Sequence, residues 1–446
     1  MPSRPMNLLI FGIDSLRADH MSCYGYHRLT TPHADRLAAE GILFENAYSA
    51  YIPTTPAYTT LFTGMDVMTH QMVALSPKGP IDEKIKLLPE LLREAGYVSF
   101  RVGFGGEFFR GFDRNIGYDE GWYAWEDRPA RKAENLNSVA IPALEELVAS
   151  GQPWMLFMRH MDPHAPYLPP PPFDQLFYSK DPTQPGLDMS PIRDFPNFRD
   201  FHLSWMPPDC QDAEHPIAMY DGALAYMDTC IQRILQRLEE LGQRETTLVV
   251  YTADHGETLY DHGCYFDHHG LYEPTLHVPL ILRFPDGRGA GRRIRGFVLH
   301  QDLAPSLLEL IGQGKLARRE KMDGKSWVPL LKGERTTNYH EFYLTECTWM
   351  RKRGWRTAEW KLIDALEPDF HNKPPVELYN LIEDPGENNN LAEKEPQVVQ
   401  WLKDRMLRWV DRRLQQTGLP DPIMQYELGL NRRIGSIAVA KKLQDR

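Results

Sequence analysis

The feature that most constrains this chain is a pair of apolar runs, far apart in the sequence, that each break at an aspartate. Residues 7–13 (Asn-Leu-Leu-Ile-Phe-Gly-Ile) precede Asp14, and residues 247–252 (Thr-Leu-Val-Val-Tyr-Thr) precede, after one alanine, the pair Asp254 and His255. Runs of this length and composition are typical of buried strands in a parallel sheet. Because functional groups of an open α/β sheet gather beyond the carboxyl ends of its strands, we expect the three side chains to converge on one cation.

A third segment carries hydroxyl groups on a proline-fixed turn. Residues 54–58 read Thr-Thr-Pro-Ala-Tyr and run on to a Thr-Gly pair at 63–64. Each segment alone has a common structural explanation, since an aspartate at a strand end often caps a helix or turns the chain. Their joint occurrence, in the order strand-Asp, hydroxyl turn, strand-Asp-His, instead predicts a metal-assisted ester hydrolase.

Further motifs follow one another along the chain. They include Asp14-Ser15-Leu16-Arg17, Thr31-Pro32-His33-Ala34, Asp162-Pro163-His164-Ala165-Pro166-Tyr167, Asp254-His255-Gly256-Glu257 and Glu377-Leu378-Tyr379-Asn380. In these motifs and their order the chain resembles the sulfatase-like branch of the alkaline phosphatase superfamily, from about Asn7 to past Ala392. The resemblance implies an α/β fold, a mainly parallel sheet sandwiched by helices, with a smaller C-terminal α+β subdomain.

The nucleophile position departs from the pattern of that family. The family signature begins with a Cys or Ser that is oxidised to formylglycine, and counting back from the Thr-Gly pair puts Thr54 at this position. Threonine carries a secondary alcohol and cannot form the aldehyde, so no formylglycine is expected. A metal-bound threonine alkoxide remains a competent nucleophile toward phosphorus. We therefore expect Thr54 to attack the ester, with Thr55 as the neighbouring alternative.

The metal ligands depart from the family pattern as well. Typical sulfatases offer two adjacent aspartates on the first strand and Asp-Asn on the later one, whereas here Ser15 follows Asp14 and His255 follows Asp254. An imidazole in place of an oxygen ligand favours Zn²⁺ or Mn²⁺ over Ca²⁺. Phosphonate monoester hydrolases of the superfamily resemble this arrangement. The residues expected to hold one ion are Asp14, Thr54, Asp254 and His255, and a second metal stays open.

Histidines are expected to contact the leaving group and the transferred group. By the resemblance, His164 occupies the substrate-contacting histidine position, a role that suits a general acid. Residues 261–270 are rich in His and Asp and end near the point where sulfatases place a lysine, so a histidine, His269 first, would replace it. His262 and His268 are expected either to contact substrate or only to satisfy loop hydrogen bonds. The cluster could also hold a second zinc.

Missing cations set the expected charge of the substrate. Residues 102–107 replace the Gly-Lys-Trp-His segment of sulfatases, and Tyr58, counted here among the substrate-binding residues, replaces the signature arginine. A pocket without these two cations favours an ester with a single negative charge. The prediction is a phosphodiester or phosphonate monoester hydrolase that forms a covalent phosphothreonine at Thr54. His164 and His269 would stabilise the leaving group and the equatorial charge.

Three alternative functions stay open. One is a sulfuric ester hydrolase that uses Thr54 without formylglycine. The second is a soluble phosphoryl transferase, whose product formation would depend on an added alcohol. The third is a noncatalytic metal-binding relative, which the presence of all four expected ligands disfavours.

Composition bears on partners and location. The 446 residues carry a formal net charge of −11, which disfavours nucleic acid as a partner. Five scattered cysteines, an odd number, do not indicate a disulfide framework. The sequence has no apolar leader and no run long enough to span a bilayer. A cytoplasmic enzyme with a small-molecule ester substrate and no membrane partner is therefore expected.

The predicted organisation has three parts. These are a catalytic domain over residues 1–314, a small antiparallel sheet with a helix over 315–418, and a tail over 419–446. Helices are expected at residues 31–40, 81–95, 132–150, 217–241 and 397–416. The proline-rich insertion 163–210 is expected to be irregular and to shape the substrate site. The tail is expected to dock on a neighbouring subunit of a homo-oligomer or to remain a free terminus.

Overall fold

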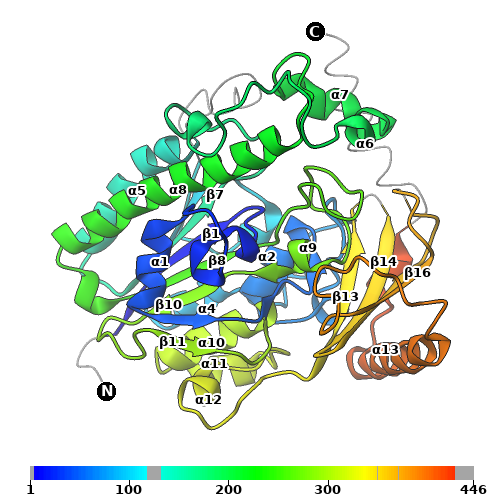
Figure 1. Ribbon diagram of the computed structural model, residues 1–446. Coiled ribbons are helices and arrows are strands. Elements are labelled where there is room, and N and C mark those ends of the chain that lie inside the picture. The colour runs from blue at the N-terminus through cyan, green and yellow to red at the C-terminus, as the bar shows by residue number, and fades with distance from the viewer. Residues whose placement is uncertain (1–4, 118–131, 349, 370, 427–446) are drawn as a thin grey trace.

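The core of the protein is an eight-stranded sheet in the order β11-β2-β10-β8-β1-β7-β5-β6. The computed structural model describes residues 5–117, 132–348, 350–369 and 371–426. It puts β1 (Asn7–Ile13) between β7 (Trp154–His160) and β8 (Thr247–Ala253), parallel to both (Figure 1). Every residue of these three strands is buried, because helices cover both faces of the sheet.

The outer strands extend this parallel centre in two ways. Beyond β7, the strands β5 (Val98–Gly103) and β6 (Arg114–Ile116) continue the parallel set. Beyond β8, β10 (Leu280–Arg283) runs antiparallel to both β8 and β2 (Ile42–Phe44). The edge strand β11 (Arg292–Ile294) is again parallel to β2, so the sheet is mixed.

Helices lie on both sides of the sheet. One side carries α1 (Pro32–Ala39), α5 (Lys132–Ala149) and α8 (Glu214–Glu240), and the other carries α10 (Leu303–Leu310), α11 (Gly314–Arg319) and α12 (Val328–Leu331) (Figure 1). The helix expected at 81–95 is confined to α4 (Leu88–Glu94), where Pro89 stands in the first turn, as proline commonly does at helix starts. None of the described helices is long and apolar enough to cross a membrane.

A second sheet, in the order β16-β15-β14-β13-β4, forms the C-terminal subdomain. Its antiparallel strands are β13 (Glu341–Cys347), β14 (Arg351–Thr357), β15 (Trp360–Ala365) and β16 (Val376–Asn380). The short strand β4 (Tyr51–Ile52) adds parallel to β13, so this sheet is tied to the segment that leads into Thr54. The main sheet and this subdomain confirm the predicted fold class.

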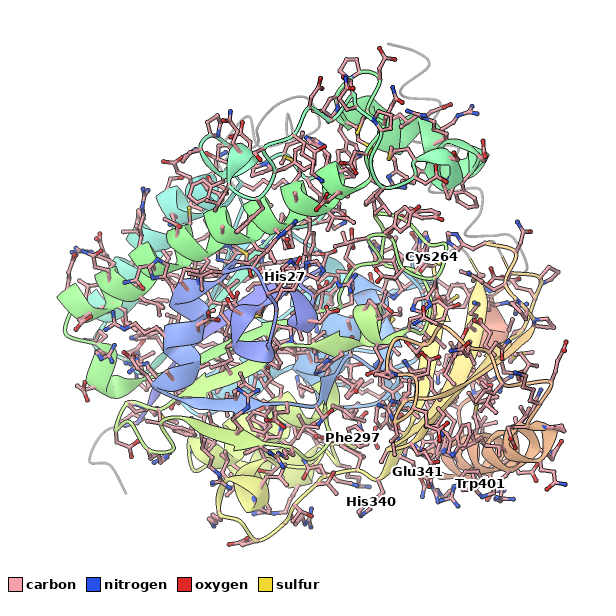
Figure 2. The ribbon with its side chains drawn as sticks, viewed as in Figure 1. His27, Cys264, Phe297, His340, Glu341 and Trp401 are labelled. Carbon is pink, nitrogen blue, oxygen red and sulfur yellow. The ribbon has the colours of Figure 1, made fainter. Side chains whose placement is uncertain are left out.

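The helix α13 (Pro396–Thr417) packs against the C-terminal sheet. Its Arg405 pairs with Glu341 and lies 5.5 Å from the ring centroid of Trp401. Glu341 and Trp401 are labelled in Figure 2. Arg413 of the same helix reaches Asp66, the N-cap of α3 (Val67–His70), at 2.9 Å. After α13, the 3-10 helix η8 (Pro422–Gln425) buries Ile423. The predicted tail, residues 419–446, thus begins with a segment whose Ile423 packs into the core of this chain, and its residues 427–446 lie outside the described residues.

The insertion 163–210 is more regular than expected. It contains the short helices α6 (Ser190–Arg193) and α7 (Pro196–Trp205), each with a proline in its first turn. The ring of Trp205 at the end of α7 packs 5.2 Å from Tyr167 and 6.0 Å from Phe266. Residues 163–189 are irregular as expected, apart from the 3-10 helix η5 (Phe173–Gln175), whereas residues 190–193 and 196–205 are helical because proline begins these helices rather than breaking them.

Candidate active site

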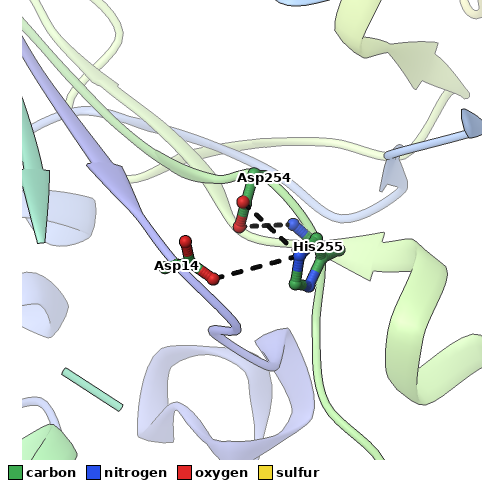
Figure 3. A group of neighbouring side chains, drawn as sticks. All are labelled: Asp14, Asp254 and His255. Carbon is green, nitrogen blue, oxygen red and sulfur yellow. Dashed lines mark hydrogen bonds and ion pairs between the residues drawn. The ribbon is translucent and has the colours of Figure 1, made fainter. Parts of the chain in front are cut away.

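Two adjacent strands bring Asp14, Asp254 and His255 together at one sheet edge (Figure 3). The pairing of β1 with β8 aligns Ile13 with Ala253, so the two aspartates follow at the same level. His255 Nε2 lies 3.9 Å from Asp14 Oδ1 and 3.4 Å from Asp254 Oδ2. All three side chains are fully buried. The sequence predicted this convergence from the two strand ends.

Thr54 joins the group as the first residue of α2 (Thr54–Thr63). Its Oγ1 lies 3.0 Å from His255 Nε2. His255 Nδ1 lies 2.9 Å from the carbonyl oxygen of Gly256, which only accepts, so Nδ1 carries the ring proton and Nε2 accepts from the Thr54 hydroxyl. The hydroxyl of Thr55 instead donates to the carbonyl of Leu75 at 2.8 Å. The geometry therefore distinguishes the two candidate threonines and favours Thr54.

The electrostatics of the cluster favour a bound cation. Burial raises the pKa of Asp254, and the charge of Asp14 raises it further. Burial acts on Asp14 in the same direction, but Arg159 and the neighbouring histidines hold its pKa below the ordinary value. Burial also lowers the pKa of His255 to about 3, so its ring is neutral. Within the described residues, Asp254 Oδ2 accepts no hydrogen bond.

These residues fit a divalent metal ion. Two carboxylates, a neutral imidazole nitrogen and a hydroxyl form a mixed N/O donor set, which suits Zn²⁺ or Mn²⁺ better than Ca²⁺. The donor atoms of Asp14, Asp254 and His255 lie within 4.8 Å of one another. The 3.0 Å between Thr54 Oγ1 and His255 Nε2 is the spacing of two neighbouring ligands that each lie about 2.1 Å from one ion.

A pocket of about 610 Å³ opens in front of Thr54. Its wall includes Arg159, His164 and His268, with residues 75–80 on the opposite rim. The ring of His268 stacks on that of His255 with centroids 4.5 Å apart. Burial by itself lowers the pKa of His268, but Asp267, 3.0 Å from Nδ1, holds it well above its usual range. The pocket thus combines a hydroxyl, two histidines and an arginine.

The two other histidines of the 261–270 loop lie elsewhere. His269 is fully buried, with Nδ1 2.9 Å from His371 Nε2 and Nε2 3.3 Å from Asp267. His262 stacks on Tyr272 with ring centroids 3.9 Å apart. Among the described residues, neither histidine lines the pocket. His268 occupies the wall position at which we expected His269. The sequence of an irregular loop has no periodic pattern that would show which of the two adjacent residues faces the pocket.

Arg159 lines the pocket, whereas Tyr58, which the sequence placed among the substrate-binding residues, is not among the described residues of the pocket wall. Tyr58 is fully buried in α2, and the guanidinium of Arg159 lies 5.2 Å from the centroid of its ring. Sequence reasoning missed Arg159, although one charged residue inside the apolar run of β7 was the signal that could have found it. Of the insertion 163–210, the described pocket wall includes only His164, so we found no wider contribution of that stretch to the pocket.

The chain matches the family described as Sulfatase over residues 6–313, which is more than half of its length. It also matches the family described as N-sulphoglucosamine sulphohydrolase, C-terminal, over residues 261–412. Members of the sulfatase family bind a divalent metal, as the buried Asp-Asp-His group would allow here.

Similar proteins include both sulfatases and phosphonate monoester hydrolases. The N-acetylglucosamine-6-O-sulfatase of Bacteroides thetaiotaomicron is 25% identical, over 91% of this chain and 87% of the relative. The multifunctional alkaline phosphatase superfamily protein PehA of Trinickia caryophylli is 26% identical, over 73% and 77%. The solved phosphonate monoester hydrolase of Agrobacterium radiobacter has a TM-score of 0.71 at 22% identity, covering 92% of this chain and 96% of its own. This structural likeness shows the fold.

Proposed function

The chain belongs to the sulfatase family of hydrolases, within the alkaline phosphatase superfamily, and from this premise we propose that it hydrolyses phosphate diesters or phosphonate monoesters. The observation that carries the proposal is Thr54 itself. A threonine stands at the nucleophile position, and its hydroxyl donates to His255 Nε2 at 3.0 Å beside two buried carboxylates. Threonine cannot become the aldehyde that sulfate ester chemistry uses in the family, but it can attack phosphorus.

The residues that would hold the metal are Asp14, Thr54, Asp254 and His255. When bound, Mn²⁺ or Zn²⁺ would lower the pKa of the coordinated hydroxyl and offset the charge of the ester. The Gly256 carbonyl fixes the His255 tautomer, so Nε2 is the nitrogen that faces Thr54. Thr54 also stands at the start of α2, where the helix dipole favours the negative charge that develops on Oγ1.

The reaction we propose has two displacements at phosphorus. In the first, Thr54 Oγ1 forms a bond to phosphorus while the bond to the leaving oxygen breaks, which yields a phosphothreonyl ester. In the second, the oxygen of water bonds to phosphorus and the bond to Oγ1 breaks, which frees the threonine. Each displacement transfers one proton, from the attacking hydroxyl or water to the departing oxygen.

Two histidines on the pocket wall suit the proton transfers. His164 Nδ1 lies 2.7 Å from the carbonyl of Ala165, so Nδ1 donates there and Nε2 is the nitrogen for substrate. His268 Nδ1 is held by Asp267 at 3.0 Å, and its raised pKa makes it a cationic donor to a leaving oxygen. We assign to His268 the role that the sequence prediction gave to His269, because His268 lines the pocket with Thr54.

A sulfuric ester hydrolase is the second candidate. The curated relatives named above include a sulfatase, and a sulfate monoester carries one negative charge, like a phosphodiester. The pocket also contains Arg159 and His268, so it is richer in cations than the substitutions at the signature positions suggested. Attack by an unmodified Thr54 on sulfur would make a stable sulfothreonine, which disfavours this candidate.

Substrate hydrolysis by metal-stripped and reloaded enzyme tests the proposal. The substrates are matched nitrophenyl esters, namely a phosphate diester, a phosphonate monoester, a phosphate monoester and a sulfate. The enzyme is reloaded with Mn²⁺, Zn²⁺ or Ca²⁺, and Thr54→Ala is assayed beside it. Diester or phosphonate turnover that needs Mn²⁺ or Zn²⁺ and Thr54 is the expected result. Dominant sulfate turnover would favour the second candidate, and a rate that rises with added alcohol would indicate a transferase.

A further inference from the structure

Arg159 is a buried cation near the end of β7, two residues below the level of the carboxylates in the sheet. In the sheet it lies in register between Gly12 of β1 and Gly103 of β5. Neither neighbour has a side chain, and a Cβ atom at Gly103 would lie 2.4 Å from the carbonyl oxygen of Arg159. A Cβ atom at Gly12 would lie 2.6 Å from the Phe157 ring and 3.3 Å from the Tyr58 hydroxyl. The space above Gly12 is therefore filled by Phe157 and by Tyr58.

Three aromatic rings surround the guanidinium. Its central carbon lies 5.2 Å from the ring centroids of Tyr58 and Phe104 and 5.7 Å from that of Phe108. Arginine is the cation best suited to such contacts, because its planar group is weakly hydrated and stacks on aromatic faces. The Arg159 side chain is only 4% exposed, so its position is fixed by packing against neighbouring groups.

The polar contacts of Arg159 connect it to the candidate site. One Nη atom donates to Asp14 Oδ2, and the other donates to the carbonyl of Gly105 at 3.2 Å. The second carboxylate oxygen, Asp14 Oδ1, is the one that faces His255 Nε2. Asp14 thus has one oxygen for Arg159 and one for the cluster. At the same time Arg159 lines the pocket together with Thr54.

We propose that Arg159 binds the anionic nonbridging oxygen of the transferred group while it holds Asp14. This proposal deepens the proposed function, since it assigns the cation that recognises the charge of the ester. The guanidinium has five N–H donors in a fixed plane, so it can serve a carboxylate and a substrate oxygen together. The three aromatic rings restrict the orientation of the guanidinium plane at the pocket wall. Arg159 of β7 thereby supplies a positive charge in place of the cationic side chains that typical sulfatases have in the segment 102–107 and at position 58.

Arg101 provides a matched control. It is 6% exposed on the neighbouring strand β5, and its central carbon lies 5.0 Å from the Phe109 ring centroid. Its guanidinium donates to Asn115 at 2.9 Å and to the carbonyl of Gly103 at 2.7 Å. Arg101 is not among the described residues that line the pocket. Arg101→Met therefore removes an equally buried, ring-packed arginine without touching the pocket.

The test compares Arg159→Met, Arg159→Lys and Arg101→Met by calorimetric titration and by kinetics. Inorganic phosphate is titrated into Mn²⁺-saturated protein, and Mn²⁺ is titrated separately into stripped protein. For Arg159→Met we expect phosphate to bind at least about tenfold more weakly and kcat/KM for the diester to fall about 100-fold, as when one charge-stabilising donor is removed. Arg159→Lys should recover part of both losses, and Arg101→Met should behave as wild type.

The Mn²⁺ titration separates binding from positioning. If Arg159→Met weakens Mn²⁺ binding and leaves phosphate binding at saturating Mn²⁺ unchanged, Arg159 only positions Asp14 and the proposal is wrong. If thermal unfolding shows that Arg159→Met is not folded, the comparison is made with Arg159→Lys instead. The proposal is then overturned if both phosphate binding and kcat/KM are unchanged in Arg159→Lys. Inactivity of the wild type toward every ester would refute the proposed function alone, because phosphate binding still reports on Arg159.

Discussion

The Thr54 hydroxyl and His255 Nε2 form a hydrogen bond of 3.0 Å whose direction is set by the carbonyl of Gly256. A second threonine of the same helix, Thr60, also pairs with a histidine, His70 of α3 (Val67–His70), at 2.9 Å. There the Met72 N–H donates to His70 Nδ1, so Nε2 carries the proton and donates to Thr60. The two pairs are alike in length and opposite in direction. Of these two threonines, Thr54 donates its proton to the histidine, whereas Thr60 accepts one.

Replacing Thr54 with valine should abolish turnover, because valine keeps the shape and removes the attacking oxygen. We expect a loss of about 10⁴-fold or more in kcat, as for other nucleophile deletions. Thr54→Ser should keep part of the rate, since it retains a hydroxyl. Steady-state kinetics and mass spectrometry of the quenched enzyme, which detects the phosphothreonyl adduct in the wild type, provide the measurement.

Thr60→Val is the matched control for that experiment. It breaks a buried hydrogen bond of the same kind, on the same helix, outside the pocket wall. The free energy of unfolding should fall by about 1 kcal/mol, with turnover retained. If Thr54→Val keeps its activity, the nucleophile has been misassigned and Thr55 becomes the first alternative.

The fold and the metal ligands could be predicted because they depend on strand ends. The apolar runs before Asp14 and Asp254 are long, and parallel strands deliver their C-terminal residues to one edge. The choice of Thr54 over Thr55 depended on the resemblance, and the hydrogen bond of Thr55 to Leu75 now gives a physical reason. That bond joins residues 20 positions apart, and no local pattern encodes it.

The rest of the site could not be predicted because it depends on loop geometry. Only one of the adjacent residues His268 and His269 lines the pocket, and nothing periodic in residues 261–270 marks which one. Arg159 was missed for a different reason. Its strand was not among the predicted strands, and the rings that surround its charge come from Tyr58 and the segment 104–108, far away in sequence.

Metal removal should destabilise the wild type. At a free Mn²⁺ or Zn²⁺ concentration 100 times Kd, we expect about 2.7 kcal/mol of extra unfolding free energy relative to the stripped protein. Asp254→Asn should lose this difference, because it removes a charged ligand. Its Oδ1 can still accept from the backbone N–H groups of Ser15 and His255. Thermal or urea unfolding with and without metal measures the difference.

The same variant should be more stable than the wild type when both are free of metal. Folding raises the pKa of Asp254, so the metal-free fold loses stability as pH rises above the ordinary carboxyl pKa of about 4. Asparagine removes that loss at pH 7. Asp66→Asn, which changes another buried carboxylate outside the cluster, should keep the metal-dependent difference. A metal-dependent gain that persists in Asp254→Asn would contradict the ligand assignment.

His160 should make stability depend on pH. Its ring is fully buried, and burial lowers its pKa to about 3. Among the described residues, neither ring nitrogen has a hydrogen-bond partner. Below the ordinary pKa of about 6.5 the unfolded chain binds a proton that the folded chain does not, so stability falls as pH falls from about 7 toward 3.

His160→Phe should remove this contribution. Relative to the wild type, the variant should gain about 2 kcal/mol of unfolding free energy between pH 7 and pH 5, which follows from the two pKa values. Phenylalanine is close in shape, and Phe11, whose ring centroid is 6.1 Å away, offers an apolar neighbour. Urea unfolding at both pH values measures the gain. Equal differences at pH 7 and pH 5 would mean that His160 titrates normally in the fold.

Replacing His268 and replacing its neighbour His269 should have different effects on kcat/KM. The effect of replacing His268 should depend on the leaving group of the ester, and the effect of replacing His269 should not. A donor to the leaving oxygen matters for an alkoxide, which needs a proton, and little for nitrophenolate, which departs without one. His268→Gln should therefore lower kcat/KM for an alkyl diester by about 10²–10³-fold and affect the nitrophenyl diester much less. The measurement is kcat/KM for a series of diesters that differ in the pKa of the leaving alcohol.

His269→Gln serves as the control because His269 lies outside the described pocket wall, with Nδ1 2.9 Å from His371 Nε2. Its loss should lower stability and reduce the rates of alkyl and nitrophenyl diesters by the same factor. A steeper dependence on leaving-group pKa in His269→Gln than in His268→Gln would reverse the assignment. In that case the loop would have to rearrange when substrate binds, since His269 is fully buried in the substrate-free protein.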